Sequence, residues 1–204
     1  MLPLCRAQPE AALKRLQQGV FSAVYCAVYS GWMLRTERLV LRQWRDSDRE
    51  PFAAMGQSAE VMRHFPALIS REQSDAFVDR VTAHLDDHGW GLWAVEHNGT
   101  FIGFTGLAMP RFEAAFLPGT EIGWRFAAHA WGQGFATEAA RAVLAYAFDE
   151  LELAEVLSFT TVANERSRAV MERIGMEYAL DFDHPNVPEG HPQRPHVLYR
   201  AIRQ

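Results

Sequence analysis

One short segment with two glycines has the residue types of an anion-binding loop. It reads Trp131-Gly132-Gln133-Gly134-Phe135-Ala136-Thr137 and precedes a predicted helix. The glycines can adopt backbone conformations that a Cβ would obstruct, and they let an anion approach the main chain closely. The N–H groups at a helix start have no partner inside the helix, and the helix dipole adds partial positive charge. The segment therefore predicts a phosphate or pyrophosphate site, with a tight turn that binds no ligand as the alternative.

The basic residues and the cysteines limit the chemistry that the chain can perform. Its 20 basic residues are nineteen arginines and one lysine, Lys14, and both cysteines, Cys5 and Cys26, also precede residue 33. Residues 33–204 therefore hold no lysine for a Schiff base, pyridoxal phosphate or a P-loop, and no cysteine nucleophile or thiolate zinc ligand. An anion site made from backbone N–H groups agrees with this composition.

A Rossmann dinucleotide-binding loop is the rival interpretation of the segment. The spacing is Gly-x-Gly-x-x-Thr, so the third glycine of that motif is absent. The acid that binds the ribose is expected about 20 residues further on, at the end of a second strand. Asp149 and Glu150 fall instead at the end of a predicted helix. The sequence therefore disfavours this interpretation.

The surrounding elements are expected to place the segment between a strand and a long helix. Alternating or β-branched patterns predict strands at residues 39–44, 90–96, 100–109, 121–126, 156–162, 178–182 and 197–202. Helices are predicted after an N-cap at Asp46 or Ser47, after an N-cap at Ser70, from residue 136, and over residues 164–175. This order predicts one α+β domain with a mostly antiparallel sheet of about seven strands and about four helices.

Two local patterns sharpen this expectation. Asn98-Gly99 lies between two predicted strands and predicts a two-residue hairpin turn. Four aromatic residues of the same strands are expected in the core rather than at a ligand; they are Trp90, Trp93, Phe101 and Phe104.

The whole-chain composition restricts the partners. The chain has 204 residues, 49% of them hydrophobic and 22% charged, with a formal net charge of −5. These values are ordinary for a globular domain, and the negative charge argues against an electrostatic nucleic-acid binder. The apolar run at residues 20–29 is shorter than the about 20 residues that span a membrane. Residues 1–32 form an extension that fits a secretory signal, a helix lying on the domain, or translation from an upstream start, with Met33 as the natural beginning.

Motifs in a fixed order resemble a known family. They read Leu34-Arg35-Thr36-Glu37-Arg38-Leu39-Val40-Leu41-Arg42, Glu121-Ile122-Gly123-Trp124-Arg125-Phe126, the glycine segment, and Asn164-Glu165-Arg166-Ser167-Arg168-Ala169-Val170-Met171-Glu172-Arg173-Ile174-Gly175-Met176. Residues 33–204 resemble the GNAT superfamily of acetyl-CoA-dependent N-acetyltransferases, and most closely its RimJ/RimL-like branch, which acetylates protein N-termini. The resemblance implies a twisted, mixed sheet of the GNAT type over these residues.

The resemblance also implies a cosubstrate, acetyl-CoA, and residues that bind it. The backbone N–H groups of residues 132–137 would hold the pyrophosphate, and the strand Trp124-Arg125-Phe126 would pair through its backbone with the pantetheine arm, much as a peptide adds a strand to a sheet. Asn164 would hydrogen-bond the cofactor, with Ser167 nearby, although Asn164 also fits a plain helix N-cap.

Two positions depart from the usual family pattern. Trp131 stands where the family usually has Arg or Gln, which is common in the RimJ/RimL-like branch. Met171 stands where many members have a tyrosine that protonates the leaving thiolate. That proton would then come from Ser167, Tyr178 or water, and we favour Ser167.

The nucleophile must be a neutral amine. An α-amino group has a pKa of about 7.7–8.0, so its deprotonation at pH 7 costs roughly 1–1.4 kcal/mol, against roughly 4.6 kcal/mol for a lysine side chain. A carboxylate acting through water suffices as base, and Glu121 is the best-placed candidate; an ordinary salt-bridged glutamate is the alternative. A backbone N–H of the same strand would polarise the thioester carbonyl. The absence of cysteine after residue 33 favours direct attack.

The acceptor stays open at this stage. A protein N-terminus and a small amine, such as an antibiotic or polyamine, both fit, and so does an acyl-CoA-binding module without activity. No acidic run marks a pocket for a polycation. Asp183, His184, His191 and His196 match no compact zinc motif, so no metal site is predicted; their loop is read as a substrate-side wall or a plain surface loop. The supply of acetyl-CoA favours the cytoplasm, and a homodimer is compatible with the family.

Overall fold

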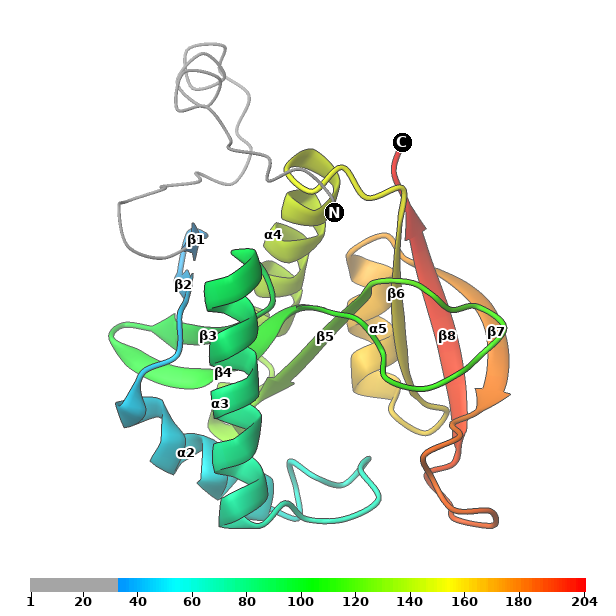
Figure 1. Cartoon of the computed structure of the whole chain (residues 1–204), viewed down its shortest axis with the longest axis horizontal. Coiled ribbons are helices and arrows are strands. Elements are labelled where there is room, and N and C mark those ends of the chain that lie inside the picture. The colour runs from blue at the N-terminus through cyan, green and yellow to red at the C-terminus, as the bar shows by residue number, and fades with distance from the viewer. Residues whose placement is uncertain (1–32) are drawn as a thin grey trace.

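The computed structural model describes residues 33–204 and places eight strands in one sheet (Figure 1). The expectations for residues 1–32 lie outside the described residues. The strands are β1 (Leu34–Arg35), β2 (Leu39–Arg42), β3 (Leu92–His97), β4 (Thr100–Ala108), β5 (Glu121–Phe126), β6 (Glu155–Thr161), β7 (Glu177–Asp183) and β8 (Pro195–Ile202). Their order is β1-β2-β3-β4-β5-β6-β8-β7, and every neighbouring pair is antiparallel except β5 and β6. The mostly antiparallel sheet is confirmed, and the strand not predicted is the two-residue β1.

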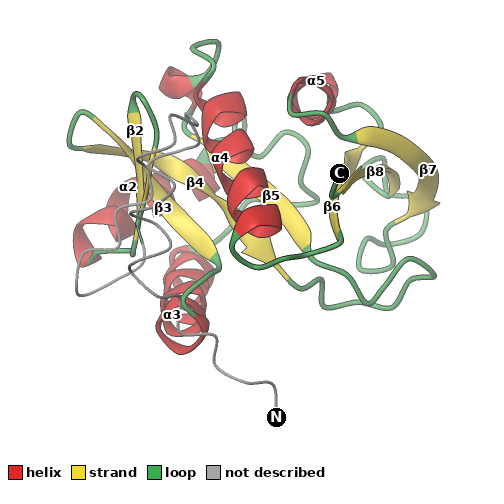
Figure 2. Ribbon diagram, turned by 90° about the horizontal axis from the view of Figure 1, so that it is seen from above, coloured by secondary structure: helices red, strands yellow, loops and turns green. Residues whose placement is uncertain are grey.

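Helices cover both faces of the sheet. They are α2 (Asp46–Gln57), α3 (Arg71–His88), α4 (Phe135–Asp149) and α5 (Glu165–Arg173), and a 3-10 turn lies at Ala128–Ala130. Figure 2 shows α3 and α4 on opposite sides of the strands β3 to β5, with α5 on the same side as α4. The predicted α+β architecture is therefore confirmed.

Aromatic contacts identify the two faces of the sheet. The ring of Trp93 in β3 lies 5.4 Å from that of Tyr146 in α4. The ring of Phe104 in β4 lies 5.9 Å from that of Phe52 in α2, on the other face. Trp93, Phe101 and Phe104 are buried, and Trp90 packs against the core while partly exposed. The four predicted core aromatics are confirmed in this role.

The strands β5 and β6 separate soon after they meet. One residue pair, Glu121 with Leu157, joins them in parallel. The Leu157 N–H donates to the Thr120 carbonyl at 2.8 Å, and the Ser158 hydroxyl donates to the Ile122 carbonyl at 2.9 Å. Beyond these contacts the two strands diverge, as Figure 1 shows. We call the space between them the splay.

The turn between β3 and β4 follows the prediction. Asn98 and Gly99 both have positive φ angles, 49° and 78°, as a two-residue primed hairpin turn requires. The Ser70 cap is also confirmed, because its hydroxyl accepts the Gln73 N–H at 3.2 Å.

The start of α2 differs from the prediction. Its N-cap is Arg45, whose N–H donates to the Asp48 carboxylate at 2.8 Å, so the assignment of Asp46 or Ser47 as the cap is wrong. The Asp48 carboxylate also receives two hydrogen bonds from the buried guanidinium of Arg42, at 2.7 and 2.9 Å. The boundary of the helix is therefore set by an acid that binds a residue of β2.

Candidate active site

The glycine segment forms an open cradle at the start of α4. Gly132 and Gly134 have φ angles of 75° and 81°, in the left-handed region that favours glycine, and Gly134 is the N-cap of α4. Within residues 33–204, the N–H groups of residues 132–137 have no hydrogen-bond acceptor. A Cβ added at Gly132 would meet nothing within 4 Å. The local geometry therefore fits a bound anion, as the sequence predicted.

Side chains from elsewhere hold this cradle in place. The Arg38 Nη1 donates to the Gln133 carbonyl at 3.0 Å, and the Arg38 Nε donates to the Glu138 carboxylate at 2.7 Å. The indole N–H of Trp131 donates to the Phe126 carbonyl at 2.9 Å. The cradle is thus tied to the start of the sheet and to the end of β5. Phe135, Ala136 and Thr137 supply backbone N–H groups, and the buried Phe135 ring packs in the core.

The main chain of β5 has one edge toward the splay. The Ile122 carbonyl faces β6. Because the backbone groups of successive strand residues point to alternate sides, the N–H and C=O of Trp124 also point toward β6. They do so beyond Glu121, where the pairing with β6 ends. The same alternation directs Arg125 toward β4, whereas the Phe126 carbonyl is taken by Trp131. Trp124 is therefore the residue of the predicted strand best placed to meet an extended amide chain, and that contact stays a prediction.

Glu121 lies where the splay begins. It pairs with Leu157, and its Oε1 would lie 3.7 Å from a Cβ built on Gly123, so the carboxyl leans along the strand. Among the described residues no hydrogen bond contributes to the pKa of its carboxyl, whose shift comes from burial. Burial raises the pKa of Glu121 to about 8. The carboxyl is therefore a stronger base than an exposed glutamate and titrates near physiological pH.

Asn164 and Ser167 act together at the start of α5. The Asn164 Oδ1 accepts the Ser167 N–H at 3.3 Å, so the N-cap interpretation is confirmed. The Asn164 Nδ2 donates to the hydroxyls of Thr160 and Ser167, at 2.8 and 3.1 Å. Both amide hydrogens are thus engaged, while the Ser167 hydroxyl keeps its own proton to donate. Met171 is buried in the core.

The sequence did not single out the segment 58–69, which contacts β6 and the loop after β7 in the fold. Its His64 Nδ1 lies 3.5 Å from the Thr161 hydroxyl at the end of β6, and its Arg63 carbonyl accepts from Gln193 at 2.9 Å. The segment therefore spans from the α2 side of the sheet to β6 and to the loop after β7. No local sequence signal marks it, since its role comes from contacts with distant residues.

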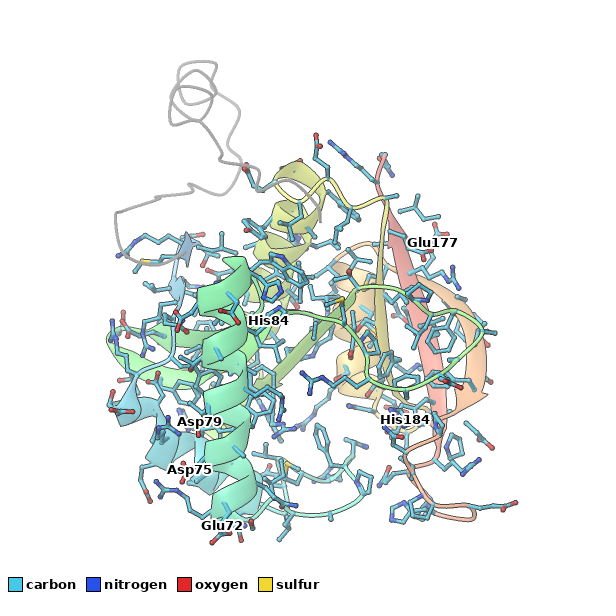
Figure 3. All side chains as sticks on the ribbon, viewed as in Figure 1. Glu72, Asp75, Asp79, His84, Glu177 and His184 are labelled. Atoms are coloured by element: carbon cyan, nitrogen blue, oxygen red, sulfur yellow. The ribbon has the colours of Figure 1, made fainter. Side chains whose placement is uncertain are left out.

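The histidines of the last loop pack with aromatic rings. His184, labelled in Figure 3, lies 4.9 Å from the ring of His196 and 4.6 Å from that of Phe112. Within residues 33–204 no three His, Cys, Asp or Glu side chains gather as metal ligands would. Gln193 of this loop contacts the segment 58–69, and the interpretation of the loop as a wall of the site stays a prediction.

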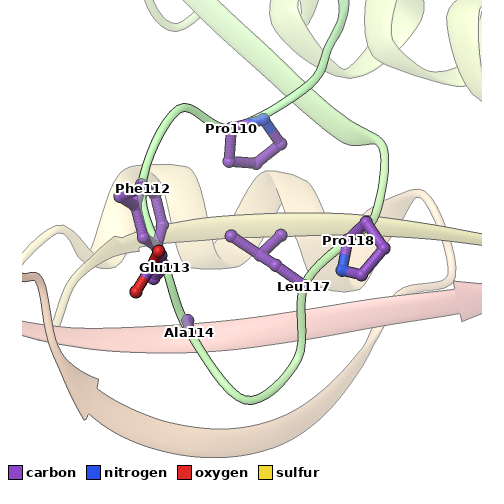
Figure 4. A pocket seen from close by; sticks show the side chains of 6 residues that line it. All are labelled: Pro110, Phe112, Glu113, Ala114, Leu117 and Pro118. Atoms are coloured by element: carbon purple, nitrogen blue, oxygen red, sulfur yellow. The ribbon is translucent and has the colours of Figure 1, made fainter.

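A hollow of about 290 Å³ lies elsewhere, in the loop before β5 (Figure 4). It is lined by Pro110, Phe112, Glu113, Ala114, Leu117 and Pro118. It contains none of the predicted site residues, so we do not assign it to the reaction. In the described part of the chain, no helix is both long and apolar enough to cross a membrane.

Comparisons with known proteins agree with this geometry. A family model described as an acetyltransferase (GNAT) domain matches residues 38–177, which include the cradle, Glu121 and Asn164. Uncharacterized protein YkkB of Bacillus subtilis (strain 168) is 32% identical over 158 residues, covering 76% of this chain and 91% of that protein. FsC-acetyl coenzyme A-N(2)-transacetylase of Aspergillus fumigatus is 41% identical over 98 residues, covering 46% of this chain and 42% of that protein. A crystal structure of a GNAT-family acetyltransferase from Bacillus anthracis superposes with a TM-score of 0.69 at 25% identity, covering 83% of this chain and 98% of that one.

Proposed function

Because the chain belongs to the GNAT acetyltransferase family, and so is an acyltransferase of the N-acetyltransferase type, we propose that it moves an acetyl group from acetyl-CoA to a primary amine by direct attack. The observation that carries this proposal is the splay. The pairing of β5 and β6 ends at Glu121 and Leu157, so the N–H and C=O of Trp124, further along β5, have no strand partner on that side. A pantetheine arm has amide groups that can hydrogen-bond such a free backbone edge.

The cradle fits the diphosphate of CoA. Backbone N–H groups without acceptors at a helix N-terminus bind phosphate without any cationic side chain. Arg166 adds a positive charge beside them, since its guanidinium lies 4.8 Å from the centre of the Trp131 ring. With the diphosphate held there, the Trp124 N–H and C=O would orient the arm, and its thioester would lie near Glu121.

Glu121 would accept the amine proton as the C–N bond forms. The tetrahedral intermediate then collapses, the C–S bond breaks, and the thiolate leaves with the electron pair of that bond. The Ser167 hydroxyl would give the thiolate its proton and recover one from solvent, and Glu121 would release the amine proton to solvent, so atoms and charge balance. Glu121 suits this role because its pKa of about 8 lies near the operating pH.

We propose a narrower class of acceptor than the family as a whole uses. The opening segment, residues 34–42, and Trp131 in the cradle favour the RimJ/RimL-like branch, and with it the α-amine of a protein or peptide. An α-amine also demands less of its base than a lysine side chain does. A small amine is the alternative acceptor. We propose a cytoplasmic setting because acetyl-CoA is supplied there.

Thiol release with acetyl-CoA and a panel of amines tests the reaction, and thermal stabilisation by CoA tests the site. Gly134→Asp keeps a residue that tolerates a positive φ but places a carboxylate in the cradle. Gly190→Asp makes the same change at a φ of 76° in the loop after β7 and serves as the control. We expect CoA to stabilise the wild type and Gly190→Asp but not Gly134→Asp. An unchanged shift in Gly134→Asp would remove the cradle assignment, and stabilisation without turnover on any amine would favour a module that binds acyl-CoA without activity.

A further inference from the structure

The side chain of Arg125 lies in an aromatic cage on the α2 face of the sheet. Arg125 is paired with Phe104 in β4, which faces α2. The guanidinium carbon lies 4.3 Å from the centre of the Phe65 ring, 5.6 Å from that of Phe104 and 6.0 Å from that of Phe52. These rings come from segment 58–69, β4 and α2. The cage therefore fixes the guanidinium on the opposite face of the sheet from α4, whose start forms the cradle.

The N–H donors of the Arg125 guanidinium lack hydrogen-bond acceptors among the described residues. Its Nε and Nη1 are sealed from solvent and have no hydrogen-bond partner among the described residues. Its Nη2 is neither sealed nor hydrogen-bonded, so this edge of the group is open. Burial alone lowers the pKa of Arg125 to about 10, with no nearby carboxylate to offset it. Aromatic contacts return less than the burial of an unpaired guanidinium costs.

Among residues 33–204 no acid forms an ion pair with Arg125, and burial is the one cause of its lowered pKa. Two acids of α3, labelled in Figure 3, are committed elsewhere, Asp75 to Arg71 at 2.7 Å and Asp79 to Arg49 at 2.6 Å. Burial and the charges of Arg63 and Arg166 lower the pKa of His64, beside the cage residue Phe65. A cationic acceptor such as a polyamine is therefore disfavoured at this wall.

Glu121 and Arg125 share a face of β5. They are four residues apart, so their Cα atoms are separated by about 13 Å along the strand. An acceptor that places its amine at Glu121 can extend along this face toward the cage. The open Nη2 of the guanidinium is then available to donate a charge-assisted hydrogen bond to an oxygen of a carboxylate.

We propose that Arg125 determines acceptor specificity by binding a carboxylate of the acceptor. This inference rests on the proposed function and names its substrate class: amino acids, or peptides with an acidic group near the reacting amine. Aminoglycosides and polyamines lack that group and are excluded.

The test compares acceptors that differ only in one charge. Free amino acids are paired with their amides, and peptides with Asp or Glu at the second position are paired with Asn or Gln peptides. Arg125→Met removes the charge and keeps the apolar stem in the cage. Arg80→Met is the control, because the Arg80 guanidinium also lies over a ring, at 5.2 Å from Phe77, but outside β5.

We expect the wild type and Arg80→Met to prefer the acid of each pair. Arg125→Met should lower kcat/KM for the acid by roughly 10-fold to 100-fold, the loss expected for hydrogen bonds to a charged group, and lower it far less for the amide. A free amino acid as the preferred member of the panel would identify its α-carboxylate as the ligand, and an acidic peptide would identify a side chain. An equal loss for acid and amide, or no acid preference in the wild type, would overturn the proposal.

Failure of the proposed function is separable from failure of this inference. If no amine is acetylated, the reaction assignment fails, and calorimetry of the same peptide pairs in the presence of CoA then tests Arg125 alone. Tighter binding of the acidic peptide, lost in Arg125→Met, supports the carboxylate site. Equal binding of both peptides, or no binding of either, overturns it.

Discussion

Glu121→Gln is expected to stabilise the protein at alkaline pH while it removes most of the activity. In the folded chain burial raises the pKa of Glu121 from 4.5 to about 8. Between these two values the unfolded chain ionises the carboxyl while the folded chain keeps it protonated. The contribution of this carboxyl to the free energy of unfolding is therefore complete below pH 4.5. It is lost as the pH rises toward 8. At about 1.36 kcal/mol per pH unit, the loss reaches on the order of 4–5 kcal/mol.

Urea unfolding between pH 5 and pH 9, without any ligand, measures this effect. Glutamine cannot ionise, so the difference in unfolding free energy between Glu121→Gln and the wild type should grow with pH and level off above about 8. Glu113→Gln, a change at an exposed carboxylate of the loop before β5, is the control and should follow the wild type. A difference that does not depend on pH would refute the assignment of a raised pKa to Glu121.

The activity of the wild type should follow the same ionisation. With a pKa of about 8, about a tenth of the Glu121 carboxyls are ionised at pH 7, so kcat/KM should rise about tenfold per pH unit below 8. Glu121→Gln should lower kcat by roughly 10²-fold to 10⁴-fold. Because an acceptor α-amine titrates in the same range, the ligand-free unfolding experiment is what isolates the carboxyl. A variant with nearly full activity would show that Glu121 is not the base.

Two further predictions concern Asp48 and Ser167. Asp48→Asn breaks a buried ion pair with Arg42 and should lower the free energy of unfolding by about 3 kcal/mol in urea titrations, whereas Asp46→Asn, at an exposed carboxylate, should change it by less than about 0.5 kcal/mol. Equal effects of the two variants would contradict the role given to Asp48. Ser167→Ala removes the proposed proton donor, which water can replace in part, so steady-state assays should show a fall in kcat of roughly tenfold with the CoA-induced thermal shift retained. An unchanged kcat would assign the proton to another donor.

The local features of the fold could be predicted because a few neighbouring residues determine them. Asn98 and Gly99 have the conformations that their turn demands, and Gly132 and Gly134 both adopt a positive φ. The Asn164 cap likewise depends on the N–H three residues further on. Strand ends moved by one or two residues, since pairing with a neighbour and not the local pattern decides where a strand stops.

The features that the sequence did not reveal depend on contacts between distant segments. Asp48 replaces Asp46 as the acid at the start of α2 because Arg42 in β2 binds it. Arg125 was predicted as a backbone contact only, since nothing in the motif around it shows that Phe52 and Phe65 enclose its side chain. The charged residues Glu121 and Arg125, four apart on one strand face, are the signal that could have drawn attention to it.

The cradle itself shows how a local motif depends on a distant partner. Glu138, in the first turn of α4, would repel a phosphate if its charge were free. Although burial opposes ionisation, hydrogen bonds from Thr36 and Arg38 lower the pKa of Glu138. The Glu138 carboxylate forms an ion pair with the Arg38 guanidinium at 2.6 Å. The same guanidinium holds the Gln133 carbonyl, so it fixes the cradle and neutralises the acid beside it. In a chain without lysine after residue 33, the main chain of the cradle would supply phosphate contacts beside Arg166, and Arg38, in the segment before β2, holds that main chain in position.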